Sequence, residues 1–178
     1  MATHRQACAI LDAVLRLPDG TARWHADRLR GAGNLPSTQG RPTQAASADV
    51  ALILLSLLLG PPATSAAGLV PAYATLSAPG EPSLGDALAD FVKEPADFFE
   101  LKVDITAPSA TLTYRGTDHG MRVTTYSPDE YWARPAFDRF AVLSADTLTR
   151  LASAIASAPP VRVGARRVTD RYRRFATQ

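Results

Sequence analysis

Arginines recur through residues 21–42, TARWHADRLRGAGNLPSTQGRP, at a spacing suited to binding a polyanion. A guanidinium group donates hydrogen bonds in a planar fork, which fits a phosphate group or the O6 and N7 atoms of guanine. The aromatic and imidazole side chains among these arginines can pack or add contacts. The candidate DNA contacts are Arg23, Trp24, His25, Arg28, Arg30 and Arg41. The alternative is an ordinary arginine-rich surface helix with Trp24 partly buried.

Residues 161–178, VRVGARRVTDRYRRFATQ, form a second basic element. Its arginines lie beside Tyr172 and Phe175, so the segment can act as an arm that neutralises phosphates and stacks on bases. The candidate contacts in this tail are Arg166, Arg167, Arg171, Arg173 and Arg174. Two alternatives stay open: a charged terminus or polar last helix without a binding role, and a segment that docks on an acidic protein partner.

The charge of the chain is unevenly distributed around a net value of +2. Residues 1–60 carry six arginines against four acids, and residues 61–160 carry seven basic residues against twelve acidic ones. Residues 161–178 carry six arginines against one aspartate. Basic ends around an acidic middle offer a polyanion two separate patches.

Residue patterns typical of enzymes are scarce. The single cysteine, Cys8, excludes an intrachain disulfide and a cysteine-based zinc cluster. The histidines lack metal-ligand spacing, and Asp118 and His119 fall in an expected hairpin turn. No phosphate loop, dinucleotide-binding glycine pattern or nucleophile elbow occurs. We therefore expect a binding protein that is not an enzyme, with no metal and no cofactor.

The first 60 residues predict three helices. Apolar residues recur every three or four positions in 3–17, and a basic helix follows that Asp19 or Thr21 can cap. Gly31 and Gly33 close this second helix, and the third, ADVALILLSLLLG after Ser47, is apolar on nearly every side. This order predicts a helix-turn-helix-like domain over residues 1–60, in which one helix enters the major groove.

The remaining chain predicts an α+β domain over residues 83–160. Residues 61–82 are rich in proline, alanine, glycine and serine and are expected to be a linker. A short amphipathic helix over 84–92 precedes strands at 99–105, 110–115, 121–126 and 139–143, whose apolar residues alternate with polar ones. The short links favour an antiparallel meander of three to four strands, and Ser144 caps a last helix before the tail, 161–178.

The pattern DGTARWHADRLRGAGNLP, followed by GRPTQAASADVALILLSLL, resembles the N-terminal region of small helix-turn-helix proteins from alphaproteobacterial temperate phages and gene transfer agents. In that family an arginine-leucine-arginine helix ends in alanine-glycine, and a basic loop leads to an aliphatic helix. The resemblance covers the N-terminal third of the chain and implies DNA binding in phage-type regulation or DNA packaging. It supports Arg23, Arg28, Arg30 and Arg41 as contacts, while Trp24 stands where a small or polar residue is more usual.

The sequence thus predicts a sequence-preferring protein that binds double-stranded DNA and acts in the cytoplasm. Residues 83–178 are expected to mediate self-association or to bind a protein partner. The alternative is a protein-interaction module, such as a phage adaptor or inhibitor, whose basic faces meet an acidic protein. No membrane role is expected, because the apolar run Val50–Leu59 is far shorter than the roughly 20 residues of a membrane-spanning helix, and no secretion signal is recognised.

Overall fold

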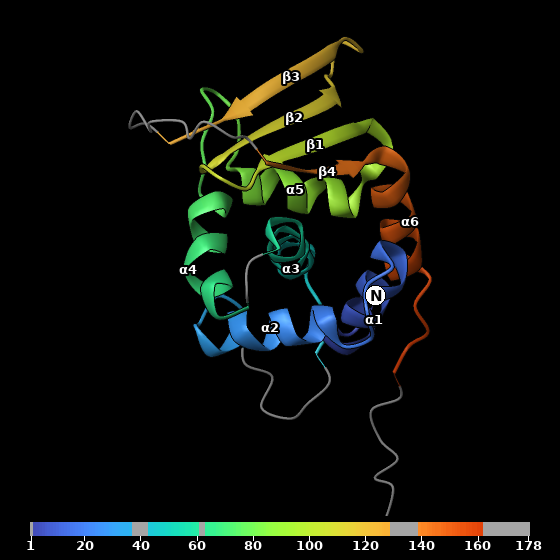
Figure 1. Ribbon diagram of the computed structural model, residues 1–178. Coiled ribbons are helices and arrows are strands. Elements are labelled where there is room, and N and C mark those ends of the chain that lie inside the picture. The colour runs from blue at the N-terminus through green and yellow to red at the C-terminus, as the bar shows by residue number, and fades with distance from the viewer. Residues whose placement is uncertain (1, 37–42, 61–62, 129–138, 162–178) are drawn as a thin grey trace, which may run out of the picture.

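The computed structural model describes residues 2–36, 43–60, 63–128 and 139–161. Its helices are α1 (His4–Leu15), α2 (Thr21–Gly31), α3 (Ser47–Leu59), α4 (Ala63–Ala74), α5 (Leu84–Lys93) and α6 (Ala145–Ala156), with a short 3-10 helix η1 at Pro95–Asp97. Its strands are β1 (Phe98–Asp104), β2 (Ser109–Arg115), β3 (Met121–Tyr126) and β4 (Phe140–Ser144). The expected α+β class is confirmed, and the helices lie to one side of an antiparallel sheet (Figure 1).

Helix α3 lies at the centre of the molecule. Its residues are apolar all round, so burial on every side is the stable arrangement, and Ile53, Leu54 and Leu55 are completely buried. Helices α2, α4 and α5 pack around it, and Figure 1 shows it nearly end-on among them. The apolar central helix predicted from the sequence is confirmed.

The start of α2 is capped from another helix. The buried carboxylate of Asp12, in α1, accepts hydrogen bonds from the backbone N–H groups of Gly20 at 2.8 Å and Ala22 at 2.7 Å. Neither Asp19 nor Thr21 supplies the cap: the N-cap residue is Gly20, which makes no side-chain cap hydrogen bond. The sequence suggested the right helix start with the wrong capping residue.

Residues 32–46 separate α2 from α3, and 37–42 of these lie outside the described residues. A helix-turn-helix unit joins its helices by a turn of about three or four residues. The coarse prediction of three N-terminal helices is confirmed, whereas their helix-turn-helix-like arrangement is not.

The segment expected to be a linker instead contains helix α4. Val70 is completely buried and Tyr73 is 2% exposed, and both belong to a hydrophobic core that extends from α1 to α6. The Tyr73 hydroxyl donates to the backbone oxygens of Asp104 at 2.6 Å and Ala107 at 3.1 Å. Alanine-rich and proline-containing composition suggested an extended chain, but the spacing of Val70 and Tyr73 buries one helix face against α2, α3 and α5.

The sheet has the strand order β3-β2-β1-β4. Strands β1 to β3 form the expected meander, but β4 pairs with β1 and not with β3, which corrects a simple four-strand meander. This is the order of a Greek key. Leu101 of β1 lies between Leu112 of β2 and Leu143 of β4, so this order completes a buried leucine row that faces the helices.

Candidate functional site

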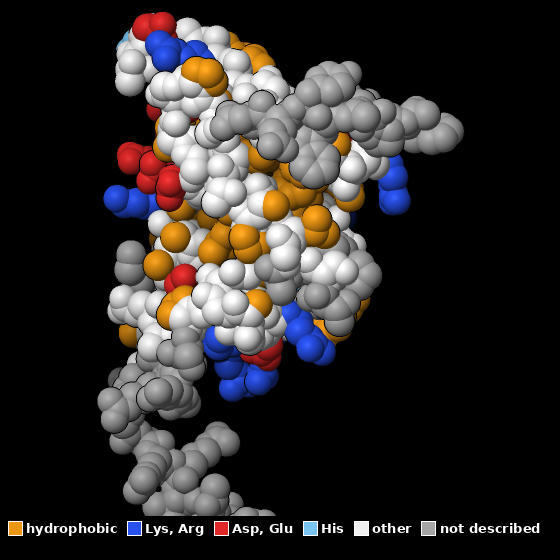
Figure 2. All heavy atoms as spheres, turned by 90° about the vertical axis from the view of Figure 1, so that its left-hand side faces the viewer, with side chains coloured by type: hydrophobic (Ala, Val, Ile, Leu, Met, Phe, Trp, Pro, Cys, Tyr) orange, Lys and Arg blue, Asp and Glu red, His pale blue; other side chains and the backbone are white. Residues whose placement is uncertain are grey.

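Helix α2 lies at the end of the molecule opposite β3 (Figure 1). Ala22, Ala26 and Leu29 are buried against the neighbouring helices, because they recur at three- and four-residue steps. The exposed residues of the helix include Arg23, Trp24, Asp27 and Arg28. Figure 2 shows basic side chains gathered at the level of α2, together with an acidic side chain.

The three arginines of α2 differ in their availability. The Arg30 side chain is only 22% exposed, donates to Asp27 Oδ1 at 2.6 Å, and also donates to the Pro36 backbone oxygen at 3.3 Å. Arg23 is 66% exposed, with its Nε 3.8 Å from Asp27 Oδ2. The Arg28 guanidinium lies 6.0 Å from the centre of the Trp24 ring. Arg23 and Arg28 can therefore reach an external anion, while Arg30 stabilises the end of α2.

Trp24 and His25 differ sharply in burial although they are neighbours in the chain. Trp24 is 48% exposed, whereas His25 is 5% exposed and its Nδ1 lies 2.7 Å from Ser56 Oγ of α3. The two rings meet edge to face with centres 5.7 Å apart. Burial lowers the pKa of His25 below its ordinary value. The structure therefore removes His25 from the predicted contact surface and leaves Trp24 on it.

The other predicted contacts lie outside the described residues: Arg41, Arg166, Arg167, Arg171, Arg173 and Arg174. The residues that flank these two segments are placed, and both bind the first turn of α1. The His4 backbone N–H donates to the Thr43 oxygen at 3.2 Å, and Gln6 Nε2 donates to the Pro159 oxygen at 2.8 Å. Described residues near both basic segments therefore contact α1, which packs against α2.

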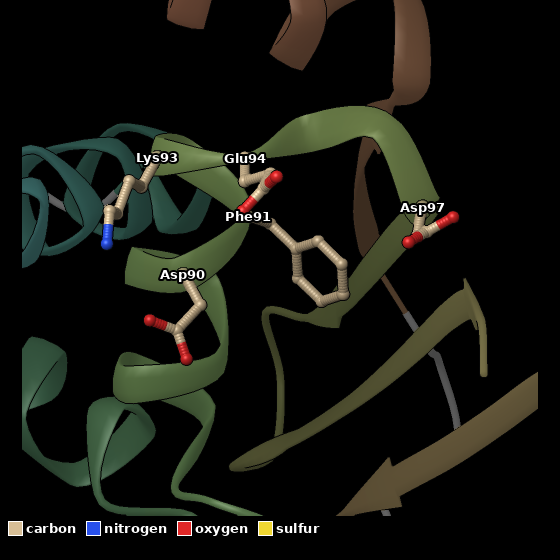
Figure 3. Close-up of a pocket in the computed structure, with 5 residues that line it drawn as sticks. All are labelled: Asp90, Phe91, Lys93, Glu94 and Asp97. Carbon is tan, nitrogen blue, oxygen red and sulfur yellow. The ribbon is translucent and has the colours of Figure 1, made fainter. Parts of the chain in front are cut away.

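A hollow beside α5 and η1 is lined mainly by charged side chains. It measures about 310 Å³ and is lined by Asp90, Phe91, Lys93, Glu94 and Asp97. In Figure 3 the Phe91 ring points into the hollow, while the carboxylates of Asp90 and Asp97 point in different directions. Over the part of the chain that the structure describes, no group of three or more His, Cys, Asp or Glu residues can hold a metal ion.

Asp118 and His119 form the predicted hairpin turn between β2 and β3. His119 has a left-handed backbone with φ 60°, and Asp118 Oδ1 accepts from the Gly120 N–H at 3.2 Å. This hydrogen bond, together with the nearby Arg122 guanidinium, lowers the pKa of Asp118. The geometry serves the turn, as the sequence predicted.

Sequence reasoning missed a group of exposed apolar residues, called the apolar patch below, on the two edges of the sheet face that points away from the helices. Its members are exposed by 44% to 65% and come from the two edge strands: Met121, Val123, Phe140 and Val142. Lys102 of β1 lies over the Phe140 ring, with Nζ 3.8 Å from the ring centre. A signal was present, because MRVTTY has apolar residues on both faces of the strand: Met121 and Val123 on one, Tyr126 on the other.

No protein-family model, curated protein or solved structure was found to match this chain. None of the helices within the described ranges has the length and apolar character that crossing a membrane requires. The chemistry of the two surfaces, α2 and the outer sheet face, is therefore the basis for a functional proposal.

Proposed function

We propose that the chain is a double-stranded DNA-binding protein that contacts DNA through the outward face of α2. The single observation that carries this proposal is the exposure of Arg23 and Arg28, with Trp24 between them, on a helix that packs against α1. Guanidinium groups on one helix face suit backbone phosphates and guanine edges.

The proposal includes a helix-turn-helix-like role for the first three helices, with α2 against the groove and α1 and α3 as its support. Arg41 and the arginines of 161–178 add phosphate contacts from the flanking segments. The resemblance of residues 19–58 to phage and gene-transfer-agent proteins favours regulation or DNA packaging, in the cytoplasm and without catalysis.

Asp27 limits the strength of this surface. It pairs with both Arg23 and Arg30, and as an acid at the centre of the basic face it repels phosphates. An exposed ion pair contributes about 0–1 kcal/mol, so Arg23 can leave Asp27 for a phosphate at little cost. Asp27→Asn should therefore raise DNA affinity several-fold, as measured by fluorescence anisotropy at low salt.

The decisive experiment is a titration with labelled duplexes from genomic fragments at two salt concentrations. Arg23→Ala combined with Arg28→Ala should weaken binding at least tenfold, about 1.4 kcal/mol, with an unchanged circular dichroism spectrum. The chain offers a matched control in Arg115→Ala combined with Arg150→Ala. Arg150 belongs to an exposed i,i+4 pair with Asp146, as Arg23 does with Asp27, and Arg115 lies 5.7 Å from the Phe99 ring.

The control removes the same charge from surfaces outside α2 and should leave affinity nearly unchanged. Equal losses in both double variants would mean that net charge alone attracts DNA, and would contradict α2 as the contact surface. Full affinity after removal of Arg23 and Arg28 would remove α2 from the interface.

A second candidate function is a protein-interaction module, and the exposed apolar residues of the outer sheet face favour it. Exposed apolar side chains on a surface commonly mark protein contacts. A pure adaptor of this kind should ignore DNA at both salt concentrations and retain an acidic protein partner, whereas a DNA-binding protein should lose affinity steeply with salt through counterion release.

A further inference from the structure

Strand β3 ends the sheet and is the strand most separated from the helices. Helices α3 and α6 pack on β1 and β4, and Figure 1 shows β3 as the outermost strand, away from the helix layer. Met121 and Val123 are 65% and 64% exposed, and Arg122 is exposed on the other face. The strand contains no proline and no bulge, two devices that commonly protect an edge from pairing.

The hydrogen-bond pattern identifies the backbone groups on the open edge. The Gly116 N–H donates to the Gly120 oxygen at 2.8 Å and closes the β2–β3 hairpin. Because hydrogen-bonded and non-hydrogen-bonded pairs alternate in an antiparallel ladder, Tyr114↔Arg122 and Leu112↔Thr124 are hydrogen-bonded pairs. The N–H and C=O groups of the residues between and around them therefore point away from β2: Met121, Val123 and Thr125.

The open stretch has defined ends. Two residues beyond Thr125, the Ser127 N–H donates to the Ser77 oxygen at 3.4 Å in an isolated antiparallel bridge. Ser127 follows the same alternation as Val123 and Thr125, so its backbone groups also point away from β2. The bridge to Ser77 therefore occupies the open edge of β3 at Ser127. The hairpin turn ends the strand at the other side. Within the described ranges, no strand pairs with this edge over residues 121–125, whose midpoint is Val123.

We propose that this edge pairs with the same edge of a second copy of the chain, antiparallel about a two-fold axis at Val123. Val123 then faces its own copy, and Met121 faces Thr125 of the partner subunit. This register offers about six backbone hydrogen bonds, two for each hydrogen-bonded pair. The dimer joins the two sheets into one.

Charge and symmetry favour a second copy as the occupant. Arg122 is the only charged residue of β3, and the proposed register places it opposite Thr124 of the partner subunit, so the two arginines do not face each other. A shift by one residue toward the hairpin would bring them together. The Met121 and Val123 side chains of both copies also come together on the outer face, which covers part of the exposed apolar patch.

The area involved predicts a weak dimer. A standard interface buries about 800 Å² of accessible surface on each partner, and pairing of two short edges buries less. Such an interface belongs to the class of transient associations. The dimer should therefore dissociate on dilution, and sedimentation of the full chain from about 1 to 100 μM should show a monomer–dimer equilibrium.

Val123→Pro tests the backbone pairing. Proline is tolerated on an edge strand where its missing N–H faces outward, so this change spares the β2 ladder and blocks the second copy. Dimerisation should weaken at least tenfold, while Val123→Thr, which keeps the N–H and suits a strand, should stay within about threefold of the parent. Circular dichroism and the thermal midpoint check that each variant is folded.

Charge substitutions at the same position test the two-fold axis and do not depend on the proline variant. Val123→Lys and Val123→Glu should each be monomeric, since like charges then meet across the axis, and an equal mixture of the two should recover the dimer. Val142→Lys on β4, a site of the outer face that is 54% exposed against 64% for Val123, should leave the dimer intact.

The proposal is overturned by a monomer at about 100 μM, by a Val123→Lys variant that dimerises like the parent, or by a dimer abolished by Val142→Lys, which would indicate face-to-face stacking. Growth beyond a dimer would also overturn it. Such growth would indicate that β3 of one copy pairs with β4 of the next, a head-to-tail contact that can continue into an open filament. None of these readouts involves DNA, so failure of the dimer and failure of the proposed function are distinguishable.

Discussion

At the residue scale, the burial of His25 predicts a dependence of stability on pH. Burial lowers its pKa in the folded chain below 6.5, so the unfolded chain binds a proton first as the pH falls. The free energy of unfolding should therefore be highest above pH 6.5 and decrease below it. His25→Asn removes the titrating group; in urea unfolding it should lose less stability between pH 8 and pH 5.5 than the parent. Equal losses would contradict a role for His25.

Cys8 offers a second test at this scale. Burial, with a smaller contribution from the Asp12 carboxylate, raises the pKa of the thiol to about 11. Two units above the ordinary value leave about a hundredfold less thiolate near neutral pH. A maleimide should therefore label the native chain at least about a hundredfold more slowly than the chain in denaturant. Fast labelling of the native chain would show that α1 opens readily.

At the scale of elements, the cap of α2 predicts which acid stabilises the helix. Asp12 accepts two backbone hydrogen bonds at the positive end of the helix dipole while almost fully buried. Asp12→Asn should lower the free energy of unfolding by about 1–3 kcal/mol. The matched control is Asp19→Asn, an exposed acid next to the same helix start, which should change stability by less than about 0.5 kcal/mol. The reverse order in urea unfolding would restore Asp19 as the cap.

The same helices and strands indicate what the sequence can and cannot predict. Alternation in β1 to β3 and the periodicity of α1, α5 and α6 are local patterns, so these elements were predicted to within a few residues. Asp12 caps α2 across a loop, Ser56 meets His25 from another helix, and β4 pairs with β1 to complete the leucine row. Such partners depend on tertiary packing and leave no local signal.

The two candidate surfaces show the same limit. The arginines of α2 were found from their spacing. That Arg30 binds Asp27 and the Pro36 oxygen, and so is less available to a ligand, could be seen only in the folded structure. Helix α4 was missed because Pro71 and small residues resemble a linker, although Val70 and Tyr73 share a buried face. The composition was informative about propensity only, and packing overrode it.

At the scale of the whole molecule, the continuous core predicts one cooperative unfolding transition and not separable units at 1–60 and 83–160. The Tyr73 hydroxyl links α4 to the end of β1 by a hydrogen bond. Tyr73→Phe should therefore lower the free energy of unfolding by about 1–2 kcal/mol, whichever part of the molecule the probe reports on. In a Trp132→Phe background, Trp24 fluorescence reports on α2 alone. Its urea midpoint should coincide with that of circular dichroism and shift equally with Tyr73→Phe. Two separate midpoints would restore the two-domain division.

The uneven charge of the molecule gives a last prediction at this scale. Residues 161–178 carry six arginines against one aspartate, and the described chain before them already contains the core. A chain ending at Pro160 keeps the hydrogen bond between Pro159 and Gln6, so it should fold with the same thermal midpoint as the full chain.

If the tail is a phosphate-binding arm, its removal should weaken binding to a specific and a scrambled duplex by the same factor, because phosphate contacts carry no base information. It should also flatten the dependence of log affinity on log salt, by about 0.9 for each phosphate that the tail neutralises. If the tail docks on a protein, DNA affinity should stay the same while recovery of an acidic partner falls. Parallel salt slopes for the two chains would therefore contradict the arm, and a truncated chain that fails to fold would assign part of the tail to the core.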